Sequence, residues 1–162
     1  MMKKSIAVLL CVILPVVFAL ASTKDGYEVK YSGGSLPTTV KSGDDLRLAV
    51  SGTEIKVTNS KGEMLLTLPP AAVTDLSYGQ EVHRRIGTAA GLAVVSLGIG
   101  ALVAFSKSKK HYVGITWDNN GVKGGLALQV DKNEYRGVLT ALEGVTGKKA
   151  VDTDEDSKKK NK

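Results

Sequence analysis

A stretch of twenty residues without a single charge, residues 86–105, constrains the fold of this 162-residue chain more than any other feature. Bases flank it on both sides: Arg84 and Arg85 before it, and Lys107, Lys109 and Lys110 after it. Twenty apolar residues in one helix match the roughly 30 Å hydrocarbon core of a bilayer. We therefore expect a membrane-associated protein whose flanking bases lie at the headgroups, where they can contact anionic lipid.

The same segment is rich in glycine, and its arrangement has several alternatives. Gly87 and Gly91 form a Gly-x-x-x-Gly pair, which lets two membrane helices approach closely. The segment could cross the bilayer once, bend as a hairpin near residues 96–100, lie flat in the headgroup plane, or pack as a core helix of a soluble protein. A single crossing would separate the strands on its two sides, and the other arrangements would keep them together.

The N-terminus has the pattern of a secretory signal peptide. Two lysines precede an apolar run that only Pro15 interrupts, and Ala19 and Ala21 fit the small-x-small rule for signal peptidase. We expect a Sec-type signal in residues 1–21 and export to the bacterial cell envelope. An uncleaved anchor helix is the alternative.

Cysteine use and charge exclude several classes of protein. The only cysteine, Cys11, lies in the predicted signal peptide, so the mature chain can form neither a disulfide framework nor a thiolate zinc site. The formal net charge is +6, and the flanks of the apolar segment hold much of it. This distribution favours anionic headgroups over a nucleic-acid groove, and we expect no nucleic-acid partner.

The rest of the chain predicts short antiparallel strands. Apolar and polar residues alternate with a period of two in seven segments that turn residues separate. These segments are residues 27–31, 46–50, 55–58, 64–68, 73–78, 112–117 and 125–130. Asn120-Gly121 predicts a hairpin between the last two, and Pro69-Pro70 ends the fourth. Regular short strands of this kind are typical of a sandwich or barrel.

A change of period after the last strand predicts a helix. Asp131 as N-cap, with Glu134 completing a capping box, predicts a helix over residues 132–143, which Gly144 would end. One apolar stripe on it can pack on the sheet: Tyr135, Val138, Leu139 and Leu142. Residues 22–151 then make one domain that contains the insert, and residues 152–162 a disordered charged tail.

Seven strands followed by one amphipathic helix resemble the layout of the pleckstrin-homology-like (PH-like) superfamily. The chain is also similar, over residues 27–149, to small exported bacterial proteins with an apolar insert. The shared pattern is Ser77-Tyr78-Gly79, His83-Arg84-Arg85, the insert, Lys109-Lys110-His111 and Ile115-Thr116-Trp117.

The resemblance implies a mainly β fold with a C-terminal helix (α+β). Its expected form is a seven-stranded antiparallel sandwich or barrel, capped by an amphipathic helix and interrupted by a glycine-rich apolar helical insert. It also implies a binding scaffold and not an enzyme. Eukaryotic members often bind phosphoinositides through bases in the first loop. Here that loop, residues 32–44, has Lys41 as its only base, so we do not extend phosphoinositide binding to this chain.

No constellation in the sequence predicts a catalytic residue, a metal site or a cofactor. His83 and His111 bracket the apolar segment, but two histidines without a third ligand make a poor metal site. We therefore expect a non-enzymatic, membrane-associated interaction module of the bacterial envelope. Its partners would be membrane lipid and either another protein or a second copy of the chain. The alternative is a structural membrane protein that self-assembles through Gly87 and Gly91.

Overall fold

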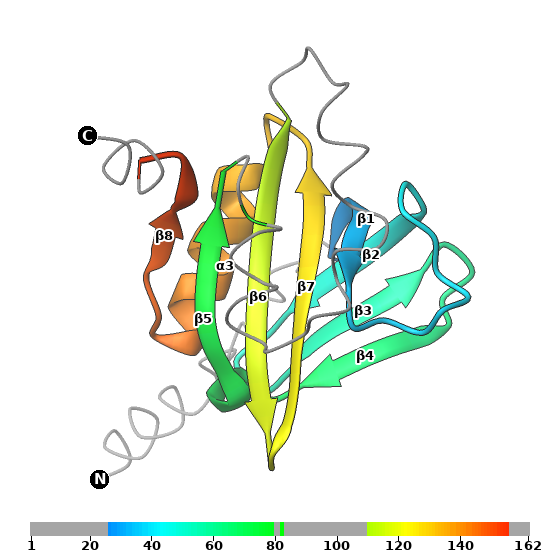
Figure 1. Cartoon of the computed structure of the whole chain (residues 1–162), viewed down its shortest axis with the longest axis horizontal. Helices are drawn as coiled ribbons and strands as arrows, with labels where there is room; N and C mark the ends of the chain where they lie inside the picture. Colours follow the sequence, from blue (N-terminus) through cyan, green and yellow to red (C-terminus); the bar gives the residue numbers. More distant parts are fainter. Residues whose placement is uncertain (1–25, 80–81, 83–109, 156–162) are drawn as a thin grey trace, which may run out of the picture.

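The computed structural model describes residues 26–79, 82 and 110–155, which form one curved sheet and one α-helix (Figure 1). The described strands are β1 (Tyr27–Gly34), β2 (Asp45–Val50), β3 (Ile55–Asn59), β4 (Met64–Leu68), β5 (Val73–Tyr78), β6 (His111–Asn119), β7 (Val122–Val130) and β8 (Ala150–Asp152). Helix α3 (Tyr135–Thr146) follows β7, and a short 3-10 helix, η1 (Pro70–Ala72), precedes β5. The predicted mainly β class with a C-terminal helix is confirmed.

The strands form a single sheet in the order β4-β3-β2-β1-β7-β6-β5-β8. All the neighbouring pairs are antiparallel except β5 and β8, which are parallel. Pairing of β1 with β7 joins the first four strands to the last hairpin. Figure 1 shows β5, β6 and β7 running side by side over α3, while β2, β3 and β4 run across their direction. The sheet is therefore curved around one core.

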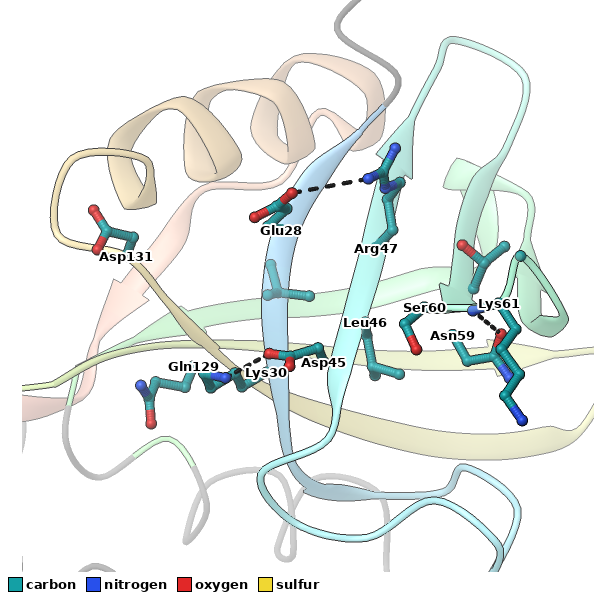
Figure 2. A pocket seen from close by; sticks show the side chains of 13 residues that line it. Glu28, Lys30, Asp45, Leu46, Arg47, Asn59, Ser60, Lys61, Gln129 and Asp131 are labelled. Atoms are coloured by element: carbon teal, nitrogen blue, oxygen red, sulfur yellow. Dashed lines mark hydrogen bonds and ion pairs between the residues drawn. The ribbon is translucent and has the colours of Figure 1, made fainter.

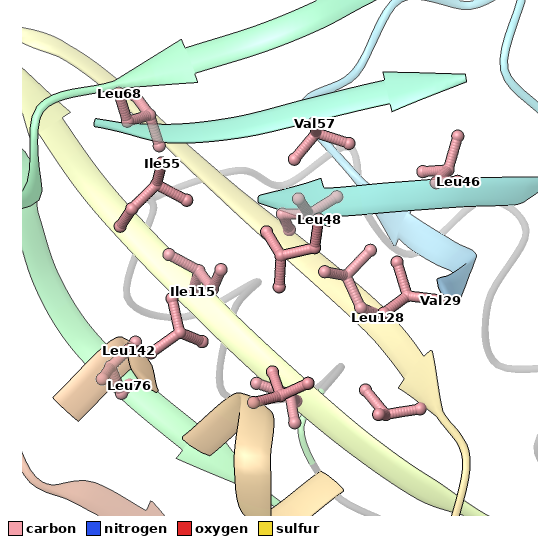
Figure 3. Packing of buried hydrophobic residues seen from close by; sticks show 14 of the residues in the cluster. Val29, Leu46, Leu48, Ile55, Val57, Leu68, Leu76, Ile115, Leu128 and Leu142 are labelled. Carbon is pink, nitrogen blue, oxygen red and sulfur yellow. The ribbon is translucent and has the colours of Figure 1, made fainter. Parts of the chain in front are cut away.

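Apolar side chains from both parts of the sheet and from α3 meet in this core (Figure 3). Leu48, Leu76 and Leu142 are fully buried there, and they come from β2, β5 and α3. Trp117 of β6 is only 5% exposed and belongs to the same core. It lies over Gly124 of β7, where a Cβ atom would come within 2.2 Å of the indole ring. This position therefore requires glycine.

The seven predicted strands all lie within β1 to β7, and the sheet has an eighth strand that the prediction did not include. Strand β8 has three residues and pairs with β5, with Ala150 opposite Leu76. Three residues are too few for a period of two to show in the sequence. The predicted tail begins at residue 152, whereas Asp152 belongs to β8 and Thr153 is buried. The apolar insert, residues 86–105, lies outside the described residues.

The turn that separates β6 and β7 agrees with its prediction. Asn120 and Gly121 both have positive φ, and the backbone N–H of Gly121 donates to Asp118 Oδ1 (2.8 Å). Both residues tolerate this conformation, so Asn-Gly joins the two strands tightly. The hairpin is longer than predicted, with nine residues in each strand.

The predicted caps of the helix are wrong at both ends. The Asp131 carboxylate accepts the backbone N–H of Asn133 (2.8 Å), which makes a turn before the helix begins. The helix itself begins at Tyr135, after Glu134, whose side chain makes no capping hydrogen bond. It continues past Gly144 to Thr146 and ends at Gly147, which has a φ of +67°. The predicted stripe still packs as expected, with Val138 and Leu142 fully buried and Leu139 partly buried against the core.

Strand β4 does not place its side chains as the sequence predicts. Alternation puts Met64 on one face with Leu66 and Leu68, but Met64 is 54% exposed while Leu68 is buried. A bulge is the reason, because Val57 pairs with Leu66 while the next residue of β3, Thr58, pairs with Met64. One irregular pair moves the side chains beyond it off the core face.

Leu142→Ala should lower the free energy of unfolding by about 2–5 kcal/mol, because Leu142 is fully buried between α3 and the sheet. Met64→Ala is the matched control, and we expect it to change stability by less than about 0.5 kcal/mol because Met64 is exposed. Urea unfolding followed by Trp117 fluorescence measures both. Equal midpoints for the two variants would contradict the packing of α3 on this core.

Candidate functional site

The two strands that flank the insert are direct neighbours in the sheet. Strand β5 ends at Tyr78 and β6 begins at His111, and the two strands pair antiparallel with Tyr78 opposite Val113. Just beyond β5, the backbone N–H of Gly79 donates to the carbonyl oxygen of Tyr112 (3.1 Å). The chain therefore leaves the sheet at the end of β5 and returns to it at the adjacent start of β6. We call this end of the two strands the junction. A single membrane crossing by residues 86–105 would place β5 and β6 on opposite sides and is incompatible with this pairing.

Aromatic and charged side chains from four elements meet at the junction. This junction cluster consists of Tyr78, His111, Tyr135, Arg136 and Asp152. The imidazole of His111 stacks on the ring of Tyr135, with ring centroids 4.2 Å apart and planes within 8°. Arg136 Nε donates to the Tyr135 hydroxyl (3.0 Å), which raises the pKa of the guanidinium. The stacked pair ties the start of α3 to the start of β6.

A second set of contacts ties β8 to the end of β5. The Tyr78 hydroxyl donates to Asp152 Oδ2 (3.0 Å), and Thr153 Oγ1 donates to the Tyr78 carbonyl (2.9 Å). The hydrogen bond to Asp152 raises the pKa of Tyr78, and burial and the negative charge of Asp152 raise it further. Gly79 follows with a φ of +119°, and a Cβ atom there would come within 2.6 Å of Thr153 Oγ1. This packing fixes the point at which the chain leaves β5.

Lys110 is the one predicted lipid-contacting base that lies within the described part of the chain. It is half-buried and directly precedes β6 at the junction. The other predicted site residues lie outside the described residues: Arg84, Arg85, Gly87, Gly91, Lys107 and Lys109. His83 lies outside as well, and His111 stacks on an aromatic ring. In residues 26–79, 82 and 110–155 there is no group of three side chains that could hold a metal ion.

No helix among the described residues is both long and apolar enough to cross a membrane. The segment for which the sequence predicts membrane contact, residues 86–105, lies outside those residues.

A polar depression of about 780 Å³ lies on the outer face of β1, β2 and β3 (Figure 2). Its charged lining residues balance in sign, with acids at Glu28, Asp45 and Asp131 and bases at Lys30, Arg47 and Lys61. Lys30 forms an ion pair with Asp45, and a longer contact of 3.8 Å joins Arg47 to Glu28. The paired charges neutralise one another, so this depression can offer hydrogen bonds to a polar ligand but little net charge.

The polar depression and most of the junction cluster have no signal in the sequence. The depression is made by the exposed residues of alternating strands, which look the same in sequence as any solvated strand face. The cluster brings together residues from β5, β6, α3 and β8 that share no spacing along the chain. The one local signal was the position of Ser77-Tyr78-Gly79 and Lys109-Lys110-His111 on either side of the insert.

No protein-family model matches this chain, and a comparison with curated proteins finds no similar sequence.

Tyr78→Phe should lower the free energy of unfolding by about 1 kcal/mol at pH 7, because it removes the hydrogen bond to Asp152. The raised pKa of Tyr78 sets the pH dependence. Tyr78 makes its full contribution to the free energy of unfolding below its pKa in the unfolded chain, about 10. This contribution is lost as the pH rises through its higher pKa in the folded protein. The difference between the two proteins should therefore shrink in alkaline buffer. Urea midpoints measure this, and identical midpoints at pH 7 would show that the contact contributes nothing.

Proposed function

We propose that this chain is a non-enzymatic, membrane-associated binding module of the bacterial cell envelope, built on a PH-like scaffold. The observation that carries the proposal is the geometry of the junction. The chain leaves the sheet and returns to it at adjacent ends of two neighbouring strands, β5 and β6. A domain of this kind can stay folded on one side of a bilayer while residues 86–105 enter the bilayer from that side.

The junction also limits how the insert can enter. A straight helix of twenty residues is about 30 Å long. The chain from residue 105 to residue 110 spans at most about 18 Å, so a straight helix that crossed the bilayer would place its far end too deep for the chain to return to β6. A bend near the middle of the segment, at about residue 96, gives two arms of about ten residues and about 15 Å each, which reach into one leaflet. We propose a hairpin and not a helix lying flat at the headgroups, because such a helix normally has a polar face and this segment has little beyond Thr88 and Ser96.

The side chains around the junction suit the level of lipid headgroups. Tyr78 and Tyr135 lie there, and tyrosine is enriched where a membrane meets water. Arg136 and Lys110 add cations to those of the nearby segment flanks, which would attract anionic lipid. Asp152 also lies at the junction, and its negative charge weakens this attraction. Burial of the apolar segment in the bilayer, and not charge, therefore supplies most of the free energy of the proposed membrane binding.

The order of the elements supports the PH-like scaffold. Seven strands, β1 to β7, precede α3, and the buried side chains of α3 face the core that these strands enclose. Strand β8 is an addition at the β5 edge of the sheet. Residues 1–21, as a signal peptide, would bring the protein to the envelope.

Sedimentation with vesicles tests the attachment. The chain beginning at Ser22 should sediment with vesicles of phosphatidylcholine and phosphatidylglycerol in equal parts, and it should stay bound in high salt, because salt screens only the bases. Replacing residues 86–105 with a short Gly-Ser linker should leave the protein in the supernatant. The linker joins two strands that are already neighbours, so Trp117 fluorescence should still report a folded core.

A matched pair of charge reversals tests the orientation of the domain. Arg136→Glu at the junction should reduce vesicle binding in low salt. Lys123→Glu should have little effect, because Lys123 lies near the other end of the β6–β7 hairpin, about 23 Å away along the strand. If the unaltered protein stays in the supernatant, or if the linker variant still sediments, the proposed attachment is wrong.

A further inference from the structure

The outer face of β5, β6 and β7 is buried, although α3 and the core lie on the opposite face. An antiparallel sheet with one covered face usually leaves the other in water. Here Ser77, Thr116 and Ala127 on the outer face are at most 4% exposed. Gly114 and Gly125 are buried beside them. We call these five residues the small-residue face.

The strand register defines this face. Ser77 pairs with Gly114, and Gly114 pairs with Ala127, so three small residues form one row across three strands. Their neighbours along the strands, Leu76 and Leu128 among them, point the other way, into the core. Small residues within strands mark places where another backbone approaches closely. The row is therefore shaped to receive a segment of chain.

Two observations show that something packs on the small-residue face. Val82, three residues after Gly79, is fully buried in a cluster with Tyr112 and Ala127. The chain that leaves β5 therefore already lies on this face. Ser77 is 3% exposed, and its hydroxyl makes no hydrogen bond to another of the described residues. A buried hydroxyl without a partner is rare, and this one faces the side from which the covering segment comes.

We propose that the small-residue face is the binding surface, in water, for the glycine-rich apolar segment of the same chain, residues 86–105. The segment begins four residues beyond Val82, and the chain returns to the sheet at Lys110, so both of its ends are held beside this face. Its glycines, Gly87 and Gly91 among them, suit a close approach to Gly114. This inference goes beyond the proposed function, because it gives the segment a partner within the protein in addition to the bilayer.

Thiol labelling of the full-length chain in buffer without lipid tests this proposal. Cys11→Ser removes the only native cysteine. In that background, Ser77→Cys should react with a maleimide at least about tenfold more slowly than Ser60→Cys, because Ser60 is exposed in the polar depression. Adding Val94→Asp and Val95→Asp, which make the segment polar, should bring the Ser77→Cys rate close to the Ser60→Cys rate.

Val113→Cys provides the control for folding. Val113 is fully buried on the core face of β6, so this variant should stay protected whether or not the two aspartates are present. Rapid labelling of Ser77→Cys with the unaltered segment would overturn the proposal. Protection that persists with the aspartates would also overturn it, and protection that disappears on dilution would assign the cover to a second copy. Vesicle sedimentation can fail while Ser77→Cys stays protected, so failure of the two proposals can be distinguished.

Discussion

The pairing of β5 with β6 is the interaction on which the rest of the structure depends. These strands flank the insert, and their register brings together two parts of the chain that residues 79–110 separate in the sequence. Without this pairing β5 and β8 would separate from the rest of the sheet, and β6 would become an unpaired edge strand. Each part alone would leave open strand edges and an uncovered apolar face. The parts of the chain before and after the insert therefore contribute strands to one sheet.

The curvature of the sheet gives its outer surface two different halves. Over β1, β2 and β3 the outer side chains are charged or polar and form the open depression. Over β5, β6 and β7 they are small and buried, with Val82 packed against Tyr112 and Ala127. The first half suits water or a polar ligand, and the second suits an apolar chain. Val82, which follows β5, already packs on the second half, so the two proposals give the glycine-rich segment two apolar surroundings, the sheet and a bilayer.

The alternation of apolar and polar residues along the chain predicts most of this fold. Each element that it misses or misplaces has a physical reason. Strands β1 to β7 each have enough alternating residues, with their own turns, to be recognised alone. Strand β8 is too short, and its pairing depends on β5, more than seventy residues earlier. Asp131 suits both a helix cap and a turn, and the bulge at Thr58 that exposes Met64 leaves no mark in the sequence. The junction cluster could not be predicted because only the folded sheet brings Tyr78, Tyr135 and Asp152 together.

Native-state hydrogen exchange tests the central claim most directly, because it measures the opening free energy of each strand separately. If the sheet is one cooperative unit, the slowest amides of β5 and β6 should exchange with the same free energy, equal to that of global unfolding. Amides of β1 and β7 should share that value, since those strands join the two parts of the sheet. If β6, β7 and α3 instead open together at a lower free energy while β1 to β5 stay protected, the insert separates two folding units and this account is wrong.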